Sequence, residues 1–140
     1  MSKPKVLFLC TTNSARSQMA EAFLKKYGGD KFEAYSAGLE PKAIDPYTEQ
    51  VMRGIGFPLT NQYSKSFREY MGKVHFAYLI TVCAEAEKNC PTTFPGVGQR
   101  LHWSFEDPAA FEGSDEEKVA KFREVRDKIE QEIKKWLKNQ

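Results

Sequence analysis

Apolar residues along this chain are grouped in short runs that alternate with longer segments of mixed polarity. The first run, Lys5-Val-Leu-Phe-Leu-Cys10, is apolar at consecutive positions, which favours a strand buried on both faces. Small polar residues follow it, so a loop is expected next. Further strands are predicted at residues 32–36, 75–82 and 99–103, and the run at 75–82 has the pattern of an interior strand.

Between these runs, apolar residues recur at helical spacing. The longest such segment covers residues 115–137. Its apolar side chains fall on one side of the predicted helix: Val119, Phe122, Val125, Ile129, Ile133 and Trp136. Shorter helices are predicted at 17–27, 46–55 and 84–89, and a turn with a short helix at 61–70.

Strands thus alternate with helices throughout the sequence. That order is typical of an α/β fold, in which a parallel sheet is covered on both faces by helices. No internal repeat, low-complexity tract or linker interrupts the pattern. We therefore expect a single domain that spans residues 1–140.

Composition and charge exclude several classes of function. The chain has 140 residues, of which 41% are hydrophobic and 29% charged, so a packed core is possible. The net charge is +2 and the basic residues form no long block, which argues against a nucleic-acid partner. The apolar run at residues 6–9 is too short for a secretion signal or a membrane span. We therefore expect a cytoplasmic protein without membrane contact.

The three cysteines are Cys10, Cys83 and Cys90. Cytoplasmic thiols are normally reduced, so these residues indicate chemistry, metal binding or core filling. The spacing of Cys83 and Cys90 does not match a zinc site, and neither His75 nor His102 pairs convincingly with them. We therefore predict no metal.

The sharpest feature is the segment Cys10-Thr-Thr-Asn-Ser-Ala-Arg16-Ser17 between the first strand and the first helix. Open parallel sheets bind ligands in such a place, beyond the carboxyl ends of their strands. Backbone N–H groups of the loop can surround an anion, and the next helix directs its positive end to the same point. Oxyanion binding or loop support is expected from these residues: Thr11, Thr12, Asn13, Ser14, Ala15 and Ser17.

The same groups act on Cys10. Arg16 brings a permanently charged guanidinium that can bind two oxygens at once. A thiol near a guanidinium and a helix N-terminus has a lowered pKa, so Cys10 is predicted to be a thiolate nucleophile beneath the anion. Taken alone, Cys10 could also be a buried core residue and Arg16 a surface charge. Their position in a strand-to-helix loop favours the catalytic interpretation.

These residues resemble the low-molecular-weight tyrosine phosphatase superfamily and, within it, the thioredoxin-coupled arsenate reductases. The resemblance covers nearly the whole chain. It rests on four segments: V-L-F-L-C-T-T-N-S-A-R-S-Q-M-A-E-A at 6–22, Y-S-A-G at 35–38, T-V-C-A-E-A-E-K-N-C-P at 81–91 and H-W-S-F-E-D-P-A at 102–109. It implies a four-stranded parallel sheet, with Cys10 as nucleophile, Arg16 as oxyanion binder and Asp107 as general acid. Residue type alone leaves Glu106 as an alternative acid.

The resemblance also implies a role for the other two cysteines. A phosphatase needs one cysteine, because water resolves its phospho-enzyme, whereas a reductase must supply two electrons. In the implied mechanism Cys10 attacks arsenate, Cys83 attacks Cys10 and releases arsenite, and Cys90 then attacks Cys83. Thioredoxin reduces the resulting Cys83–Cys90 disulfide, so the expected reductant is an external thiol and no bound cofactor is expected.

Two details extend this hypothesis. Ala109 and Ala110 stand where the resembling phosphatases usually carry tyrosines, and small residues suit a small inorganic ion. Seven residues of α-helix advance by about 10 Å, whereas a disulfide tolerates Cα separations of at most roughly 7 Å. A helix between Cys83 and Cys90 is therefore expected to unwind, at least in part, when the two form a disulfide.

Some of the resembling reductases bind potassium beside the loop. Asn13, Glu21 and Ser36 match that site, but Lys65 stands where the resemblance expects an acidic ligand. A lysine cannot ligate a cation, although its ammonium can occupy the same electrostatic place beside Glu21. We therefore predict that activity does not require potassium.

Two alternatives stay open on the sequence alone. A low-molecular-weight protein tyrosine phosphatase would hydrolyse phosphomonoesters through Cys10, with Cys83 and Cys90 as bystanders. Because the same loop can hold phosphate, a weak phosphatase side activity is also compatible with a reductase. A redox or oxyanion sensor would form the cysteine bridge without turnover.

Overall fold

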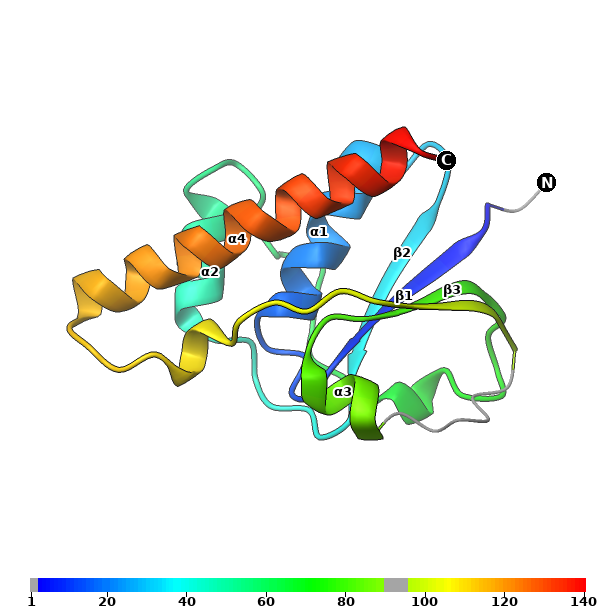
Figure 1. Cartoon of the computed structure of the whole chain (residues 1–140), viewed down its shortest axis with the longest axis horizontal. Coiled ribbons are helices and arrows are strands. Elements are labelled where there is room, and N and C mark those ends of the chain that lie inside the picture. The colour runs from blue at the N-terminus through cyan, green and yellow to red at the C-terminus, as the bar shows by residue number, and fades with distance from the viewer. Residues whose placement is uncertain (1–2, 90–95) are drawn as a thin grey trace.

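The computed structural model of the chain describes residues 3–89 and 96–140 (Figure 1). Its elements follow one another in this order: β1 (Lys5–Cys10), α1 (Arg16–Gly28), β2 (Glu33–Gly38), α2 (Pro46–Arg53), the 3₁₀ turn η1 (Phe67–Glu69), β3 (Phe76–Thr81), α3 (Ala84–Asn89), β4 (Val97–His102), the 3₁₀ turn η2 (Pro108–Ala110) and α4 (Asp115–Lys138).

The four strands form one sheet in the order β2-β1-β3-β4, and all neighbouring strands are parallel. The predicted α/β fold with a four-stranded parallel sheet is therefore confirmed. In β1 the register pairs Cys10 with Gly38 of β2, and Leu9 with Thr81 of β3. Because all carboxyl ends lie along one edge of the sheet, the loops that follow β1, β2, β3 and β4 meet there.

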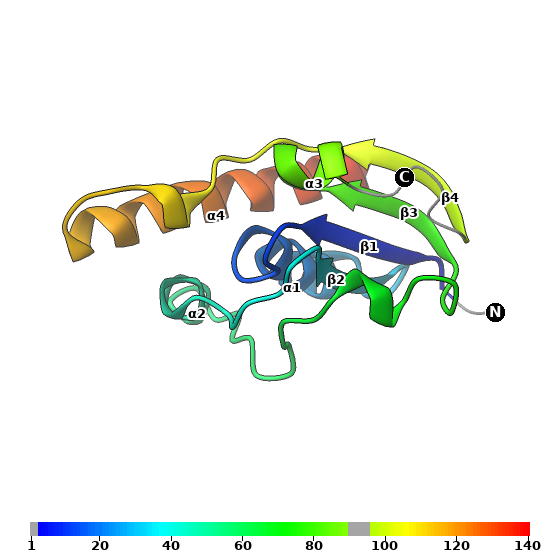
Figure 2. The same ribbon diagram turned by 90° about the horizontal axis from the view of Figure 1, so that it is seen from below.

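Both faces of the sheet are covered. Helices α1 and α4 lie together on one face (Figures 1 and 2), where Phe8 of β1 contacts Trp103 and Trp103 contacts Trp136 of α4. On the opposite face, Tyr70 beside η1 packs edge-on against Tyr35 of β2, with ring centres 5.4 Å apart. This double coverage explains why β1 is apolar at consecutive positions.

The long C-terminal helix α4 has the amphipathic pattern that the sequence predicts. It begins at a capping box, in which the Ser114 hydroxyl accepts from the Glu117 N–H and the Glu117 carboxylate accepts from the Ser114 N–H. Its buried side chains are Phe122, Val125, Ile129 and Ile133. Within the described ranges, no helix is both long and apolar enough to cross a membrane.

Several predicted elements have other bounds in the structure: β4, for example, covers Val97–His102 instead of residues 99–103, and α2 ends at Arg53 instead of residue 55. Strand β2 continues to Gly38, because Gly38 pairs with Cys10 and its N–H donates to the Lys65 carbonyl over 2.8 Å. The helix expected within residues 61–70 is reduced to the single turn η1. The chain before this turn forms hydrogen bonds with the loop after β1, and these take the place of a helix: the Ser64 hydroxyl, for example, donates to the Thr12 carbonyl over 3.1 Å.

Candidate active site

The loop between β1 and α1 is held from outside through its carbonyl groups. Backbone N–H groups donate over 2.8–3.1 Å in these four pairs: Leu39 to Cys10, Glu40 to Thr11, Lys42 to Thr12 and Asp45 to Ser14. The Asn13 carbonyl accepts from the Gln18 side chain over 3.0 Å. Because the C=O and N–H groups of a trans peptide point in opposite directions, the loop N–H groups are turned toward its inner side. The loop thus offers several donors to one oxyanion.

The left-handed backbone of Asn13 closes this loop. Its φ is 53°, a conformation that asparagine tolerates better than most residues. The Asn13 amide nitrogen donates to the hydroxyls of Ser17 and Ser36, over 2.8 and 2.9 Å. Its amide oxygen accepts from the Lys65 N–H over 3.1 Å. All these partners are buried, so the conformation of Asn13 is fixed from several sides.

Close packing of β2 against the loop depends on Gly38. A Cβ atom at this position would lie 2.9 Å from the Thr11 carbonyl oxygen, which is too close for any other residue. Thr12, the residue before Asn13, does not adopt a positive φ. Its hydroxyl lies 2.7 Å from the Ser14 hydroxyl, so a side chain is accommodated there.

Arg16 lies at the start of α1 with its side chain buried. One terminal nitrogen, Nη1, donates to the Phe105 carbonyl over 3.1 Å, and the other, Nη2, lies 3.7 Å from Asp107. Its Nε has no hydrogen-bond partner among residues 3–89 and 96–140. A buried unpaired donor is unfavourable unless a ligand satisfies it. The helix N-terminus beside it carries no side-chain cap either, so both features fit an anion held in the loop.

The electrostatics of the loop favour the ionised form of Cys10. This residue is buried at the end of β1. Its pKa is lowered to about 5, first by a hydrogen bond from the Cys83 thiol, then by the charge of Arg16 and by hydrogen bonds from Ser17 and the Asn13 N–H. Burial opposes this shift but does not overcome it. Cys10 is therefore a thiolate near neutral pH, the state that a nucleophile requires.

Cys83 lies beside Cys10 because β3 pairs next to β1, with the Val82 N–H donating to the Leu9 carbonyl over 2.9 Å. Both sulfurs are free and buried. The Cys83 sulfur lies 3.5 Å from the Thr11 hydroxyl. Its pKa is raised, chiefly because its thiol donates a hydrogen bond to Cys10 and also because it is buried. One of the two sulfurs thus carries the negative charge while the other keeps its proton.

Cys90, the third predicted cysteine of the site, lies outside the described residues. Helix α3 occupies Ala84–Asn89 directly after Cys83, in agreement with the predicted helix at 84–89. The proposed bond between Cys83 and Cys90 stays a prediction.

The loop after β4 brings one of the two candidate acids to the site. Asp107 faces Arg16, and its carboxylate accepts from the Ala109 N–H over 3.0 Å at the start of η2. Glu106 is instead paired with Lys121 of α4 over 3.1 Å. Asp107 is also largely exposed, so proton exchange with water is possible. The geometry favours Asp107 over Glu106 as a proton donor to a group bound in the loop.

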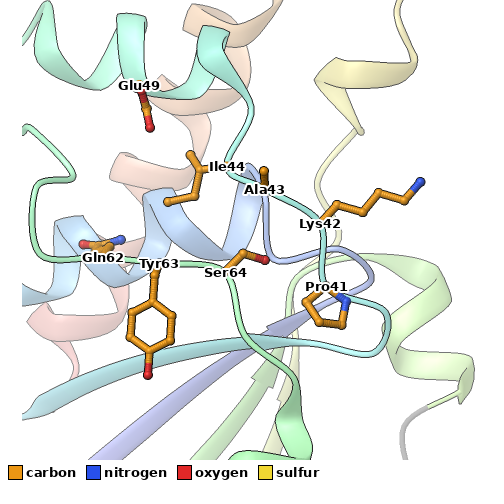
Figure 3. A pocket seen from close by; sticks show the side chains of 8 residues that line it. All are labelled: Pro41, Lys42, Ala43, Ile44, Glu49, Gln62, Tyr63 and Ser64. Atoms are coloured by element: carbon orange, nitrogen blue, oxygen red, sulfur yellow. The ribbon is translucent and has the colours of Figure 1, made fainter.

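A hollow of about 530 Å³ lies behind the loop (Figure 3). It is lined by Pro41, Lys42, Ala43, Ile44, Glu49, Gln62, Tyr63 and Ser64. Neither Cys10 nor Arg16 borders it. The Lys42 N–H and the Ser64 hydroxyl, both at its edge, donate to the Thr12 carbonyl. The hollow therefore borders the outer side of the loop, away from the anion-binding side.

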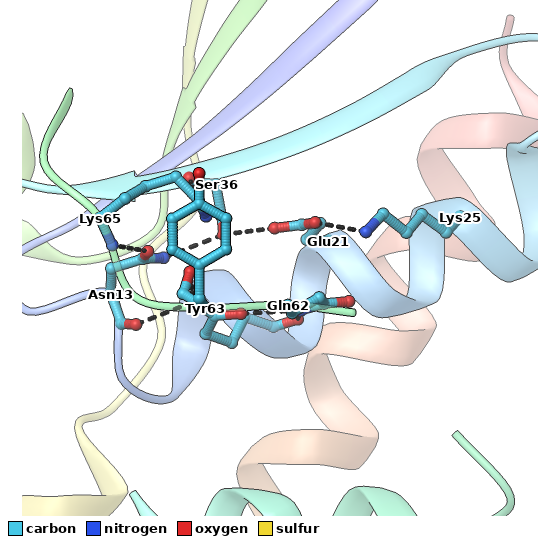
Figure 4. A network of polar contacts seen from close by, with 8 residues as sticks. Asn13, Glu21, Lys25, Ser36, Gln62, Tyr63 and Lys65 are labelled. Carbon is cyan, nitrogen blue, oxygen red and sulfur yellow. Dashed lines mark hydrogen bonds and ion pairs between the residues drawn. The ribbon is translucent and has the colours of Figure 1, made fainter. Parts of the chain in front are cut away.

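A polar network supports the loop from behind (Figure 4). The Ser36 hydroxyl donates to Glu21, and Lys25 pairs with the same carboxylate over 2.6 Å. The Lys65 ammonium donates to the Ser36 carbonyl over 3.0 Å. The structure thus brings together Asn13, Glu21, Ser36 and Lys65, the four residues that the sequence associated with a cation-binding position.

Sequence reasoning missed two supporting glutamines. Gln18 is fully buried and its side-chain nitrogen donates to the carbonyls of Asn13 and Tyr63. Gln62 in turn donates to the Gln18 side chain over 2.8 Å. A glutamine in the first turn of α1, directly before the buried Met19 and Ala20, is a signal for such support, because a buried amide requires partners.

Comparisons with known proteins agree with this geometry. The family described as "Low molecular weight phosphotyrosine protein phosphatase" matches residues 5–140. An arsenate reductase from Halalkalibacterium halodurans is 45% identical over 135 residues, which are 96% of this chain and 95% of that protein. A solved structure described as "An arsenate reductase in the phosphate binding state" has a TM-score of 0.80 at 27% identity and covers 97% of this chain and 98% of the other. A thioredoxin-dependent arsenate reductase from Corynebacterium glutamicum has a TM-score of 0.71 at 28% identity, covering 98% of this chain and 61% of the other.

These matches confirm the resemblance that the sequence motifs indicated. The family match begins at the first residue of β1 and includes every helix and strand described above. The relative from Halalkalibacterium halodurans and the solved structure with the TM-score of 0.80 both carry the name arsenate reductase. The chain belongs to the low molecular weight phosphotyrosine protein phosphatase family.

Proposed function

We propose that this protein reduces arsenate to arsenite and that thioredoxin regenerates it. The observation that carries the proposal is the pair of thiols at the oxyanion loop: Cys83, between β3 and α3, donates a hydrogen bond to Cys10 at the start of the loop. Hydrolysis of a phosphoester uses one sulfur, whereas reduction requires a second one within reach of the first. The names of the similar proteins support the same reaction.

The first step is a displacement at arsenic. The Cys10 thiolate forms an S–As bond, an As–O bond breaks, and the oxygen leaves as water after it receives protons. Asp107 delivers one of these protons, because its carboxyl group is the acid that faces Arg16. Arg16 and the loop N–H groups stabilise the negative charge on the remaining oxygens.

The second step is a redox step between two sulfurs. Cys83, as a thiolate, attacks the Cys10 sulfur; the S–As electron pair goes to arsenic, which leaves as arsenite, and a Cys10–Cys83 disulfide forms. The ionised Cys10 raises the pKa of Cys83 before the reaction. Once Cys10 is bonded to arsenic that charge is gone, while the Thr11 hydroxyl still lies 3.5 Å from the Cys83 sulfur. The second thiol is thereby activated only after the first has reacted.

The third step transfers the disulfide to Cys90, which restores Cys10 as a thiolate. Two residues seven apart on a helix lie about 10 Å apart, so α3 must unwind for Cys83 and Cys90 to bond. The dithiol of thioredoxin then reduces this disulfide, as is typical of thiol–disulfide exchange in a reducing compartment such as the cytoplasm. One arsenate thus consumes two thiols of thioredoxin, and no resident cofactor enters the cycle.

The experiment is NADPH consumption by the protein with arsenate, thioredoxin and thioredoxin reductase. Cys83→Ser and Cys90→Ser are each expected to abolish steady turnover, because each interrupts the transfer of the disulfide. Hydrolysis of p-nitrophenyl phosphate is the matched control, since it requires Cys10 but neither of the other cysteines. If the protein consumes no NADPH with arsenate, while both variants hydrolyse the ester as fast as the wild type, a phosphatase is the correct assignment.

A further inference from the structure

Lys65 is an unusual residue to find behind an anion-binding loop. Only 6% of it is exposed, although a lysine normally keeps its ammonium in water. Its Nζ donates to the Ser36 carbonyl over 3.0 Å and lies 4.5 Å from the centre of the Tyr63 ring (Figure 4). None of the three steps of the proposed reaction uses this charge, so its burial requires another reason.

The charge of Glu21 provides that reason. Glu21 is 5% exposed and accepts the Ser36 hydroxyl. The charged groups that face Lys65 are Glu21 and Lys25 of α1 and Glu69 of η1; burial lowers the pKa of Lys65, while the two carboxylates raise it. A buried carboxylate behind a loop that holds a thiolate would be strongly unfavourable without a nearby cation. Lys25 supplies one from the surface side, where its side chain is 43% exposed.

A continuous path of hydrogen bonds links Lys65 to the nucleophile. Ser36 accepts a hydrogen bond from the Lys65 ammonium through its carbonyl, and one from the Asn13 amide nitrogen through its hydroxyl. The same amide donates to the Ser17 hydroxyl, and Ser17 is one of the donors that lower the pKa of Cys10. In addition, the Lys65 N–H donates to the Asn13 amide oxygen, and the Gly38 N–H donates to the Lys65 carbonyl.

We propose that Lys65 is a positioning residue for the reaction: its buried ammonium, bound to the Ser36 carbonyl, shares with the exposed Lys25 the compensation of the Glu21 charge, so that the Ser36–Asn13–Ser17 path can hold the loop in place behind Cys10. The role lies in the charge of Lys65 and not only in its packing. It rests on Cys10 being the nucleophile, as in the proposed function, but it does not depend on which oxyanion Cys10 attacks.

The test is the pH midpoint of Cys10 alkylation by iodoacetamide, followed by mass spectrometry of the Cys10 peptide. Lys65→Gln is expected to move the midpoint upward by about one pH unit, because Glu21 then opposes the thiolate. Lys65→Arg keeps the charge and is expected to leave the midpoint near that of the wild type. Lys25→Met is the matched control, since it removes the exposed lysine from the same carboxylate, and a shift of less than about 0.3 is expected.

The double variant Glu21→Gln/Lys65→Gln separates charge from geometry. It removes both charges, so its midpoint should return toward the wild-type value. If Lys65→Gln does not fold, Glu21→Gln can be compared with the double variant, because the two differ only in the charge of residue 65. The pH midpoint of Cys10 alkylation should be lower in Glu21→Gln, which keeps the Lys65 ammonium. Three results would each overturn the proposal. The wild type and Lys65→Gln could have equal midpoints, or Lys65→Gln and Lys65→Arg could shift the midpoint equally. Glu21→Gln and the double variant could also have equal midpoints. Because alkylation involves neither arsenate nor thioredoxin, this result is independent of whether the reductase assignment holds.

Discussion

The two sides of the Cys10 loop are built differently. Behind the loop, Asn13, Ser36, Glu21 and Lys65 are buried and hydrogen-bonded to one another. In front, Asp107 is 44% exposed and sits on a single 3₁₀ turn, and the helix after Cys83 has only six residues. A preorganised rear fixes the oxyanion and the thiolate in advance. In the proposed function, the groups in front transfer protons and electrons and contact thioredoxin, and short, exposed elements permit the movement that these steps need.

The largest effect should come from Arg16, whose guanidinium contacts Phe105 and Asp107 in front of the loop. Arg16→Lys keeps the positive charge but loses the planar pair of donors, so kcat/KM for arsenate is expected to fall by about 10² to 10³. Steady-state kinetics with the thioredoxin system measures this loss. A variant with unchanged kcat/KM would mean that the guanidinium geometry does not serve the oxyanion.

A smaller loss of activity is expected when Asp107, in front of the loop, is replaced. Asp107→Asn removes the proposed proton donor but keeps the hydrogen bond that the side chain accepts from the Ala109 N–H, so kcat should fall by about 10² with KM little changed. Glu106→Gln is the matched control, because Glu106 is paired with Lys121 instead. Similar rates for the two variants would remove Asp107 from the mechanism.

Arg16 and Asp107 show how much of the site could be predicted from the sequence. The apolar run of β1 and the C-x5-R spacing placed Cys10 and Arg16 in one loop, since a strand-to-helix turn is a local feature. Asp107 is 91 residues along the chain from Arg16, and its approach to Arg16 depends on where β4 lies in the sheet. Without the family resemblance, nothing in the spacing of these residues distinguished Asp107 from Glu106.

The pairing of Cys83 with Cys10 illustrates the same limit. The sequence predicted a strand ending near Cys83, but the strand order β2-β1-β3-β4 is what places this end beside Cys10. Gln18 and Gln62 were missed for a related reason. Their role depends on partners at 13 and 63, and a pattern of hydrophobic positions carries no information about such partners.

The lowered pKa of Cys10, which the hydrogen bond from Cys83 and the charge of Arg16 chiefly cause, predicts a pH dependence of its reactivity. With a pKa of about 5 against an ordinary 9.0, Cys10 should stay reactive to iodoacetamide at pH 6, and its alkylation rate should fall about tenfold per pH unit below 5.

The lowered pKa of Cys10 also stabilises the folded state at higher pH. That contribution is complete above pH 9 and is lost as the pH falls through 5. The Tm difference between wild type and Cys10→Ser should therefore grow from pH 5 to pH 8, and a constant difference would contradict the assignment.

The smallest effect expected is the response to potassium. Behind the loop the Ser36 hydroxyl lies between the Asn13 amide nitrogen and the Glu21 carboxylate, and these three side chains carry oxygens, the donor atoms that a hard cation prefers. Here the Lys65 ammonium already donates to the Ser36 carbonyl and faces Glu21, and an ammonium has no lone pair to offer a metal. Arsenate turnover in KCl and in NaCl at equal ionic strength should therefore be the same. A clear rise with potassium would show that a cation enters despite Lys65, and the buried lysine could then not be the charge that balances Glu21.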